Sequence, residues 1–273
     1  MDRQRFYKMS GSGNDFIFFD EADGPSAAFR NPATIESLCA RGTGVGADGV
    51  VFFDRSDPAG VGISYFNSDG SVGELCGNAT LCAVRLAELL GTPVDGDLQV
   101  QTDAGEVAGR LVDGLPEIDL EPVTDVSADW SAIPPVATER RVGYSLVGVP
   151  HIAIEVPDVG AIDVIGRGSQ VRRDRSLARG ANVNFVAPAN DGRWLIRTYE
   201  RGVEGETLAC GTGAVASAIL LVTWGKASAP VGLVTKSGLE LTVTLRREGE
   251  LWYPSLRGSA ELVFTGELPT SGD

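Results

Sequence analysis

The sequence contains a weak internal repeat, in which similar motifs recur at one offset along the chain. Cys76 in ELCGNATLCAV and Cys210 in LACGTGAVASA are 134 residues apart in a chain of 273 residues. Three further pairs of motifs follow the same order at nearly the same offset: GSGNDFIFF with LVGVPHIAI, GADGVVF with GANVNFV, and YFNSDG with TYERG. One match arises easily by chance, but four in order indicate two copies of one fold.

Each copy combines strands with one apolar helix. Runs of β-branched and aromatic residues between glycine-rich turns predict strands at residues 16–19, 50–53, 63–66, 98–102, 151–156, 184–187, 195–199, 239–245 and 260–264. Apolar stretches that stop at a glycine predict helices at about 77–90 and 211–223. Both helices are apolar nearly all round, so we expect them to be buried on most faces.

The length of the chain is typical of two domains. The segment 124–140 is polar, contains two adjacent prolines and has no hydrophobic period, so it predicts a linker. We therefore expect an N-terminal half at 1–124 and a C-terminal half at 125–261. The last strand, at 262–273, is expected to return to the N-terminal half.

The charge balance excludes several classes of partner. The chain has 23 Lys and Arg against 37 Asp and Glu, a formal net charge of −14. Binding to nucleic acid or to anionic membranes needs clustered basic residues, so neither partner is expected. The N-terminal sequence MDRQRFYKMSGSGND has no apolar run, and the apolar stretch at 214–222 is far shorter than a membrane span. We expect a soluble, cytoplasmic protein with a small-molecule substrate.

Cys76 and Cys210 are the strongest candidates for chemistry. Each directly precedes a glycine at the start of an expected helix, where the helix dipole lowers the pKa of a thiol. The backbone N–H groups of the same turn can bind a carboxylate. Two such thiols can invert a stereocentre, because one removes a proton from a carbon and the other returns one to the opposite face. For Cys39 and Cys82, packing in the core is expected instead.

Four other interpretations fit the sequence less well. The sequence GVGADG matches the dinucleotide-binding pattern, but a strand and not a helix follows it, so we expect a turn. Cys76 and Cys82 are six residues apart, which is not a usual zinc-ligand spacing. A Cys–His–Asp hydrolase would use His151, the only histidine, but only one of the two repeated cysteines. Only three lysines are present, which argues against Schiff-base chemistry. We expect no metal and no cofactor.

The chain resembles the diaminopimelate epimerase family of amino-acid epimerases, which work without pyridoxal phosphate. The resemblance covers almost the whole chain and rests on FYKMSGSGNDF, RGTGVGADG, YFNSDGSVGELCGNA, GVPH, GANVNF and YERGVEGETLACGTGA. It implies an α+β fold of two similar domains, each a mixed β-sheet curled around a central helix, with the active site in the cleft between them. It also implies Cys76 and Cys210 as the acid/base pair, supported by His151 and Glu200.

The resemblance further implies a set of residues that hold the substrate through polar side chains or helix-start amides. These are Asn14, Asn67, Gly77, Asn78, Asn182, Glu200, Arg201, Gly211 and Thr212. The physical chemistry of these residue types agrees, because an Arg guanidinium can clamp a carboxylate with two hydrogen bonds and Asn can both donate and accept.

The chain departs from the family's usual pattern at a few positions. Val149 stands where the family usually has Asn before Pro-His, and Ala79 and Leu81 stand where it usually has Gly and Arg. The segment between Arg201 and Glu206 is one residue longer than the commonest form.

The expected function is epimerisation of LL-2,6-diaminopimelate to the meso form, for lysine and peptidoglycan synthesis. Three alternatives stay open: a racemase or epimerase of another amino acid such as histidine or hydroxyproline, a thiol redox switch with a Cys76–Cys210 disulfide, and an amino-acid binding module. A homodimer is possible. Two cysteines at helix starts favour catalysis, because binding alone requires no thiol.

Overall fold

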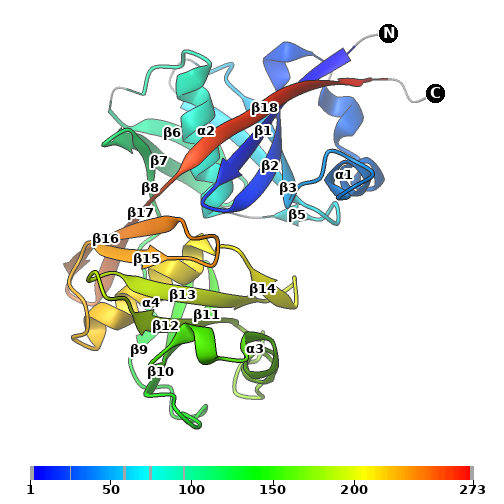
Figure 1. The fold of residues 1–273 in the computed structure, drawn as a ribbon. Coiled ribbons are helices and arrows are strands. Elements are labelled where there is room, and N and C mark those ends of the chain that lie inside the picture. Colours follow the sequence, from blue (N-terminus) through cyan, green and yellow to red (C-terminus); the bar gives the residue numbers. More distant parts are fainter. Residues whose placement is uncertain (1–2, 25, 58–59, 74–75, 95, 271–273) are drawn as a thin grey trace. The chain divides into compact units, whose positions relative to one another are not determined.

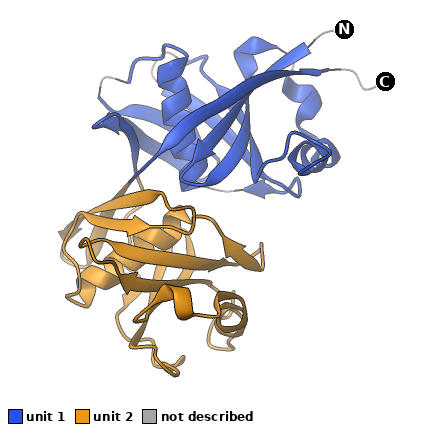
Figure 2. Ribbon diagram, in the orientation of Figure 1, with its two compact units in different colours: residues 1–118, 257–273 blue, residues 119–256 orange. Residues whose placement is uncertain are grey.

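The structure is a computed structural model that describes residues 3–24, 26–57, 60–73, 76–94 and 96–270. The chain divides into two compact units, shown in Figure 2: unit 1 contains residues 1–118 and 257–273, and unit 2 contains residues 119–256. The expected halves at 1–124 and 125–261 stay a prediction about domains.

Unit 1 is built mainly from strands (Figure 1). Its strands are β1 (Arg3–Gly11), β2 (Asn14–Asp20), β3 (Gly49–Asp54), β4 (Gly60–Asn67), β5 (Val72–Gly73), β6 (Leu98–Thr102), β7 (Gly105–Val112), β8 (Leu115–Asp119) and β18 (Ala260–Pro269). Its helices are α1 (Pro32–Cys39) and α2 (Gly77–Leu89), with 3-10 turns η1 (Glu21–Asp23) and η2 (Ser26–Phe29).

The strands of unit 1 form a mixed sheet that curls around α2. Strand β1 pairs antiparallel with both β18 and β2, so the C-terminal strand belongs to this unit. Strand β2 is parallel to β3, β3 antiparallel to β4, and β4 parallel to β6, which continues antiparallel to β7 and β8. Helix α2 packs against β18 and β1 near one end of this row and against β6 and β7 near the other. Because strands near both ends of the row contact the same helix, the sheet must curl around that helix.

From β10 onward, unit 2 has the same order of strands and α-helices as unit 1 has from β1 onward. Its strands are β9 (Val126–Ser127), β10 (Arg141–Val147), β11 (Val149–Glu155), β12 (Asn182–Pro188), β13 (Trp194–Glu200), β14 (Gly205–Thr207), β15 (Val231–Val234), β16 (Glu240–Glu248) and β17 (Leu251–Gly258). Its helices are α3 (Val164–Arg172) and α4 (Gly211–Thr223), with a 3-10 turn, η3 (Val159–Ala161).

The strand pairings of unit 2 repeat those of unit 1. Strand β10 is antiparallel to β11, β11 parallel to β12, β12 antiparallel to β13, β13 parallel to β15, and β15 antiparallel to β16. This is the order of β1, β2, β3, β4, β6 and β7. Helix α4 packs against β10, β11, β12, β15 and β16, as α2 packs against the strands of unit 1. The repeated motifs therefore fold into one topology twice.

The two predicted apolar helices are confirmed. Helix α2 begins at Gly77 and helix α4 at Gly211, and ten residues of each are buried. The nine predicted strands overlap β2, β3, β4, β6, β11, β12, β13, β16 and β18. Burial on nearly every side explains why both helices lack a polar face.

The segment 124–140 is not a linker, because it lies within unit 2 and packs against it. Ile133 is buried in the unit's core, and the Trp130 ring stacks on Tyr144 with 4.6 Å between ring centroids. A polar sequence with prolines indicated an open connection, but these two side chains hold it on the sheet.

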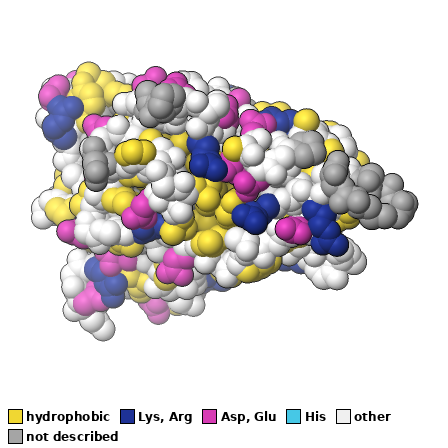
Figure 3. Space-filling view, turned by 90° about the horizontal axis from the view of Figure 1, so that it is seen from above, with side chains coloured by type: hydrophobic (Ala, Val, Ile, Leu, Met, Phe, Trp, Pro, Cys, Tyr) yellow, Lys and Arg dark blue, Asp and Glu magenta, His cyan; other side chains and the backbone are white. Residues whose placement is uncertain are grey.

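The surface shows no strongly basic region on the face in Figure 3, where Lys and Arg side chains alternate with Asp and Glu. None of the helices in the described ranges combines the length and the apolar character that a membrane span requires.

Candidate functional site

Cys76 and Cys210 occupy the same structural position in the two units. Each is the N-cap residue of its helix, with extended backbone angles of φ −124° and ψ 106° for Cys76 and φ −141° and ψ 109° for Cys210. The carbonyl oxygens accept from Thr80 N and Ala214 N, both at 2.9 Å, and start the helical ladder. Neither side chain caps its helix. The first-turn N–H groups are therefore not used by the thiols and can meet an anion.

The surroundings of Cys210 depend on a glycine one turn into α4. The residue is buried, and its Sγ lies 3.7 Å from Thr212 Oγ1. A Cβ at Gly213 would lie 3.2 Å from Cys210 Sγ and 2.3 Å from Asn184 Oδ1. Only a residue without a side chain fits here. The two distances also place Asn184 Oδ1 within about 5.5 Å of Cys210 Sγ.

In unit 1, hydrogen bonds join Asn14 and Asn78 to a charged group. Asn78 is buried and its Nδ2 donates to Asn14 Oδ1 at 2.7 Å, while Asn14 Nδ2 donates to Asp48 Oδ2 at 2.9 Å. Asp48 in turn pairs with Arg41 at 2.8 Å. Arg41 also donates hydrogen bonds to Asp15. Burial raises the pKa of Asp15, but hydrogen bonds from Arg41 and Lys8 outweigh this effect and keep the pKa below its ordinary value.

This arrangement orients both amides. A carboxylate can only accept, so Asn14 must turn its Nδ2 toward Asp48, and its Oδ1 must then accept from Asn78. Asn78 Oδ1 is consequently the last acceptor in this series of hydrogen bonds. It is buried and has no hydrogen-bond partner among the described residues. A buried acceptor of this kind suits a donor from a ligand, such as an ammonium group.

Asn67 lies at the end of β4 and hydrogen-bonds within its own turn. Its Nδ2 donates to Ser71 Oγ at 3.0 Å, and its backbone N–H donates to the Ser71 carbonyl at 2.9 Å. These contacts are those of an ordinary turn asparagine.

In unit 2, His151 is fully buried on β11 and is held by Asn184 of the adjacent parallel strand β12. Its Nδ1 lies 3.3 Å from Asn184 Nδ2. Its Nε2 is buried and has no hydrogen-bond partner in the part of the chain that the structure describes. Burial, with a smaller effect from Arg201, lowers the pKa of His151 to about 3. The imidazole is therefore neutral near neutral pH.

Asn182 and Arg201 lie close to His151. In the parallel pairing of β11 and β12, His151 is the register partner of Asn182. Asn182 is buried and its Oδ1 accepts from the backbone N–H of Arg201 at 2.8 Å. The Arg201 guanidinium is half-buried and donates to the Arg179 carbonyl at 3.1 Å. Glu200 ends β13, directly before Arg201.

The structure thus groups the predicted residues within each unit. Unit 1 contains Asn14, Asn67, Cys76, Gly77 and Asn78, and unit 2 contains His151, Asn182, Glu200, Arg201, Cys210, Gly211 and Thr212. The sequence prediction missed Asp48, Asn184 and Gly213. For Asn184 a signal was present, because in a strand it shares a face with Asn182.

Cys39 and Cys82 differ from the two helix-start cysteines. Both are buried, and burial raises the pKa of Cys39 to about 11 and that of Cys82 well above the usual range for a thiol. All four cysteines are described, and none forms a disulfide. A thiol with a raised pKa forms very little thiolate near neutral pH, so it is ineffective as a nucleophile or general base, which fits a packing role.

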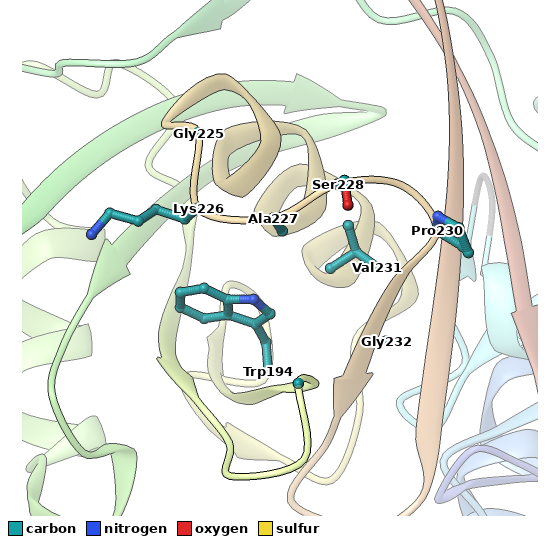
Figure 4. Close-up of a pocket in the computed structure, with 9 residues that line it drawn as sticks. Trp194, Gly225, Lys226, Ala227, Ser228, Pro230, Val231 and Gly232 are labelled. Carbon is teal, nitrogen blue, oxygen red and sulfur yellow. The ribbon is translucent and has the colours of Figure 1, made fainter.

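A hollow of about 540 Å³ opens elsewhere in unit 2, lined by Trp194, Lys226 and Ser228 among others (Figure 4). None of the predicted site residues lines it. Within the described ranges, no group of three or more His, Cys, Asp or Glu side chains can hold a metal ion.

The fold is shared with a group of solved structures. A phenazine biosynthesis protein of the PhzF family from Bacillus anthracis has a TM-score of 0.74 at 16% identity, covering 98% of this chain and 100% of its own. A hydroxyproline epimerase from Agrobacterium vitis, with bound trans-4-hydroxy-L-proline, has a TM-score of 0.67 at 14% identity, covering 97% and 92%. These likenesses define an α+β fold class with mixed sheets and few helices.

Sequence comparison places the chain more narrowly. The family profile described as "Diaminopimelate epimerase" matches residues 6–116 and 144–263. Diaminopimelate epimerases from Gemmatimonas aurantiaca and Aquifex aeolicus are 44% and 37% identical, each over 96% of this chain and 98% and 97% of their own length. The chain therefore belongs to the diaminopimelate epimerase family and is an isomerase.

Proposed function

We propose that this protein converts LL-2,6-diaminopimelate to meso-diaminopimelate, with Cys76 and Cys210 as the acid/base pair. The observation that carries the proposal is the duplication: two units of one topology each place a cysteine at the N-cap of the central helix. A binding protein or a hydrolase has no use for the same thiol at both positions. The reaction places the protein in lysine and peptidoglycan synthesis.

The chemistry balances without any external reagent. One cysteine, as the thiolate, takes the α-proton and becomes the thiol, and the electron pair stays on the α-carbon. The other cysteine, as the thiol, gives its proton to the opposite face and becomes the thiolate. The first-turn N–H groups at Gly77 and Gly211 bind the carboxylate next to this carbon and stabilise its developing negative charge. The reverse reaction exchanges the roles of the two cysteines.

The remaining predicted residues recognise the rest of the substrate. The buried acceptor Asn78 Oδ1 suits an ammonium group, and the Arg201 guanidinium suits the distal carboxylate. His151 is neutral, so it acts through hydrogen bonds and not as a second cation. Asn14, Asn67, Asn182, Glu200 and Thr212 complete the set in this proposal.

A proton-exchange assay tests the proposal. Incubation with LL-diaminopimelate in deuterated water should give meso product with deuterium at one α-carbon. Cys76→Ala and Cys210→Ala should each nearly abolish inversion while the far-UV circular dichroism stays unchanged. Cys39→Ser and Cys82→Ser are the matched controls, and they should lower stability with little effect on turnover. Near-normal turnover in either alanine variant would refute the two-base mechanism.

A second candidate is a racemase or epimerase of another amino acid. Val149 favours it, because the family usually has an Asn there that can help to hold the distal carboxylate. The same assay with histidine, hydroxyproline and other amino acids separates the two, since only the true substrate exchanges its α-proton rapidly. Reduced protein that exchanges no amino-acid α-proton, yet forms and breaks a Cys76–Cys210 disulfide reversibly, would instead favour a redox switch.

A further inference from the structure

We propose that Asn184 is a positioning residue, which holds His151 as the Nε2–H tautomer and so leaves Nε2–H as a hydrogen-bond donor for the substrate. The inference deepens the proposed function, and its part in catalysis rests on that function. The geometry itself lies entirely within unit 2, on the adjacent strands β11, β12 and β13.

The orientation of the Asn184 amide is determined by a backbone group. Its Nδ2 lies 3.1 Å from the carbonyl oxygen of Ile152, which can only accept, so the amide nitrogen must face that side. On the other side Oδ1 accepts from Thr198 Oγ1 at 2.9 Å. An exchange of the amide nitrogen and oxygen would place two acceptors against each other at Ile152.

The orientation of the amide in turn determines the tautomer of the histidine. With one N–H directed at Ile152, the second N–H of Asn184 Nδ2 points to His151 Nδ1 at 3.3 Å. Nδ1 must therefore carry a lone pair, and the single proton of the neutral ring is on Nε2. An imidazolium would bring two donors together at Nδ1, so Asn184 also disfavours the charged ring.

The remaining donor of the ring, Nε2–H, has no acceptor among the residues that the structure describes. Nε2 is buried and unpartnered in the part of the chain that the structure describes. A buried N–H without an acceptor costs free energy, and a bound substrate can supply the acceptor. Asn184 and His151 are both 0% exposed, so neither side chain can turn to water to escape this arrangement. Asn184 Oδ1 also lies within about 5.5 Å of Cys210 Sγ, which places the pair beside a proposed acid/base residue.

The tautomer of His151 can be measured directly by NMR, because the chain has one histidine. In ¹⁵N-histidine-labelled protein at pH 7, two-bond ¹H–¹⁵N correlations should show a protonated Nε2 and an unprotonated Nδ1. A wild-type spectrum of the Nδ1–H tautomer or of the imidazolium would overturn the proposal, and this measurement needs no variant.

Two variants and a control assign the effect to Asn184. In Asn184→Asp the carboxylate can only accept, so the proton should move to Nδ1 or the ring should become cationic. In Asn184→Ala the two tautomers should mix. The control, Thr198→Val, removes a hydrogen bond from the same amide but leaves its N–H facing Nδ1, so the wild-type pattern should remain.

Steady-state kinetics of the variants test the role of Asn184 in catalysis. Both Asn184 variants should lower kcat for the epimerised amino acid by roughly 10- to 100-fold, the range found when the partner that orients a metal-binding histidine is lost. KM should change much less, and Thr198→Val should keep most of its kcat. A kcat unchanged in Asn184→Ala, or an unchanged tautomer there, would refute the proposal. If wild-type protein epimerises no amino acid, the proposed function fails, while the spectrum still decides the tautomer.

Discussion

Gly213→Ala is the substitution whose outcome the structure determines most sharply. The new Cβ would lie 2.3 Å from Asn184 Oδ1 and 3.2 Å from Cys210 Sγ. Asn184 cannot move aside freely, because it is fully buried and hydrogen-bonded to Thr198 and Ile152. The added methyl group must therefore displace Asn184, the start of α4, or both.

Two opposing effects set the change in the free energy of unfolding. Alanine in place of glycine favours a helix by up to about 1 kcal/mol. Overpacking a buried site costs about 1–3 kcal/mol, and a contact this short, against a fixed side chain, belongs in the upper part of that range. We expect a net destabilisation of about 1–2 kcal/mol. Loss of the Asn184 geometry should also lower the rate of inversion by at least tenfold.

Urea unfolding followed by circular dichroism measures the first effect, and the proton-exchange assay measures the second. Gly143→Ala is the matched control: its Cβ would overpack Leu220 and Trp224 at 2.7 and 2.9 Å, in the same unit but at the other end of α4. It should lose similar stability and keep most of its activity. A Gly213→Ala protein that is about 1 kcal/mol more stable than wild type would refute the reasoning, because helix propensity would then act without any clash.

Three further predictions concern the substrate and pH. Arg201→Ala should raise KM for diaminopimelate roughly 10- to 100-fold, since charge-assisted hydrogen bonds contribute about 1.5–3 kcal/mol. Arg201→Lys should have an intermediate KM. An unchanged KM in Arg201→Ala would favour a racemase or epimerase of another amino acid. Val149→Asn should lower KM by up to about fivefold, the equivalent of one hydrogen bond of about 1 kcal/mol, and steady-state kinetics would contradict this by showing no decrease. The lowered pKa of His151, about 3 against 6.5 for the ordinary group, means that the unfolded chain binds one more proton between these pH values. Stability should therefore fall as pH falls through this window, with a slope of about 1.4 kcal/mol per pH unit that His151→Gln lacks. Parallel curves of unfolding free energy for the two proteins between pH 4 and 7 would disprove a buried neutral histidine.

Much of the fold could be predicted from local sequence. The repeat around Cys76 and Cys210 predicted one fold used twice, and the strand pairings of the two units show one topology. The two central helices were predictable because their residues are apolar on every side, a pattern typical of a buried helix. Their starts were predictable because a cysteine and a glycine precede each apolar run.

Other elements could not be predicted, because tertiary packing outweighs local preference in short segments. Helices α1 and α3 are only eight and nine residues long, too short for a clear hydrophobic period. The segment 124–140 has the composition of a linker, yet contacts of Ile133 and Trp130 with the sheet fold it into unit 2. No local pattern shows which distant surface a lone apolar residue will meet.

The residues that carry the proposed chemistry could be identified from the sequence, because cysteines before glycines at helix starts and an Arg after a strand are local features. The orientation and the charge of these residues depend on the tertiary structure. Asp48 directs the amides of Asn14 and Asn78, and Asn184 directs His151, through hydrogen bonds between side chains of different elements. The neutral state of His151 arises from burial by residues from the whole unit. Orientation and charge are set by neighbours in space, and spacing along the chain does not specify those neighbours.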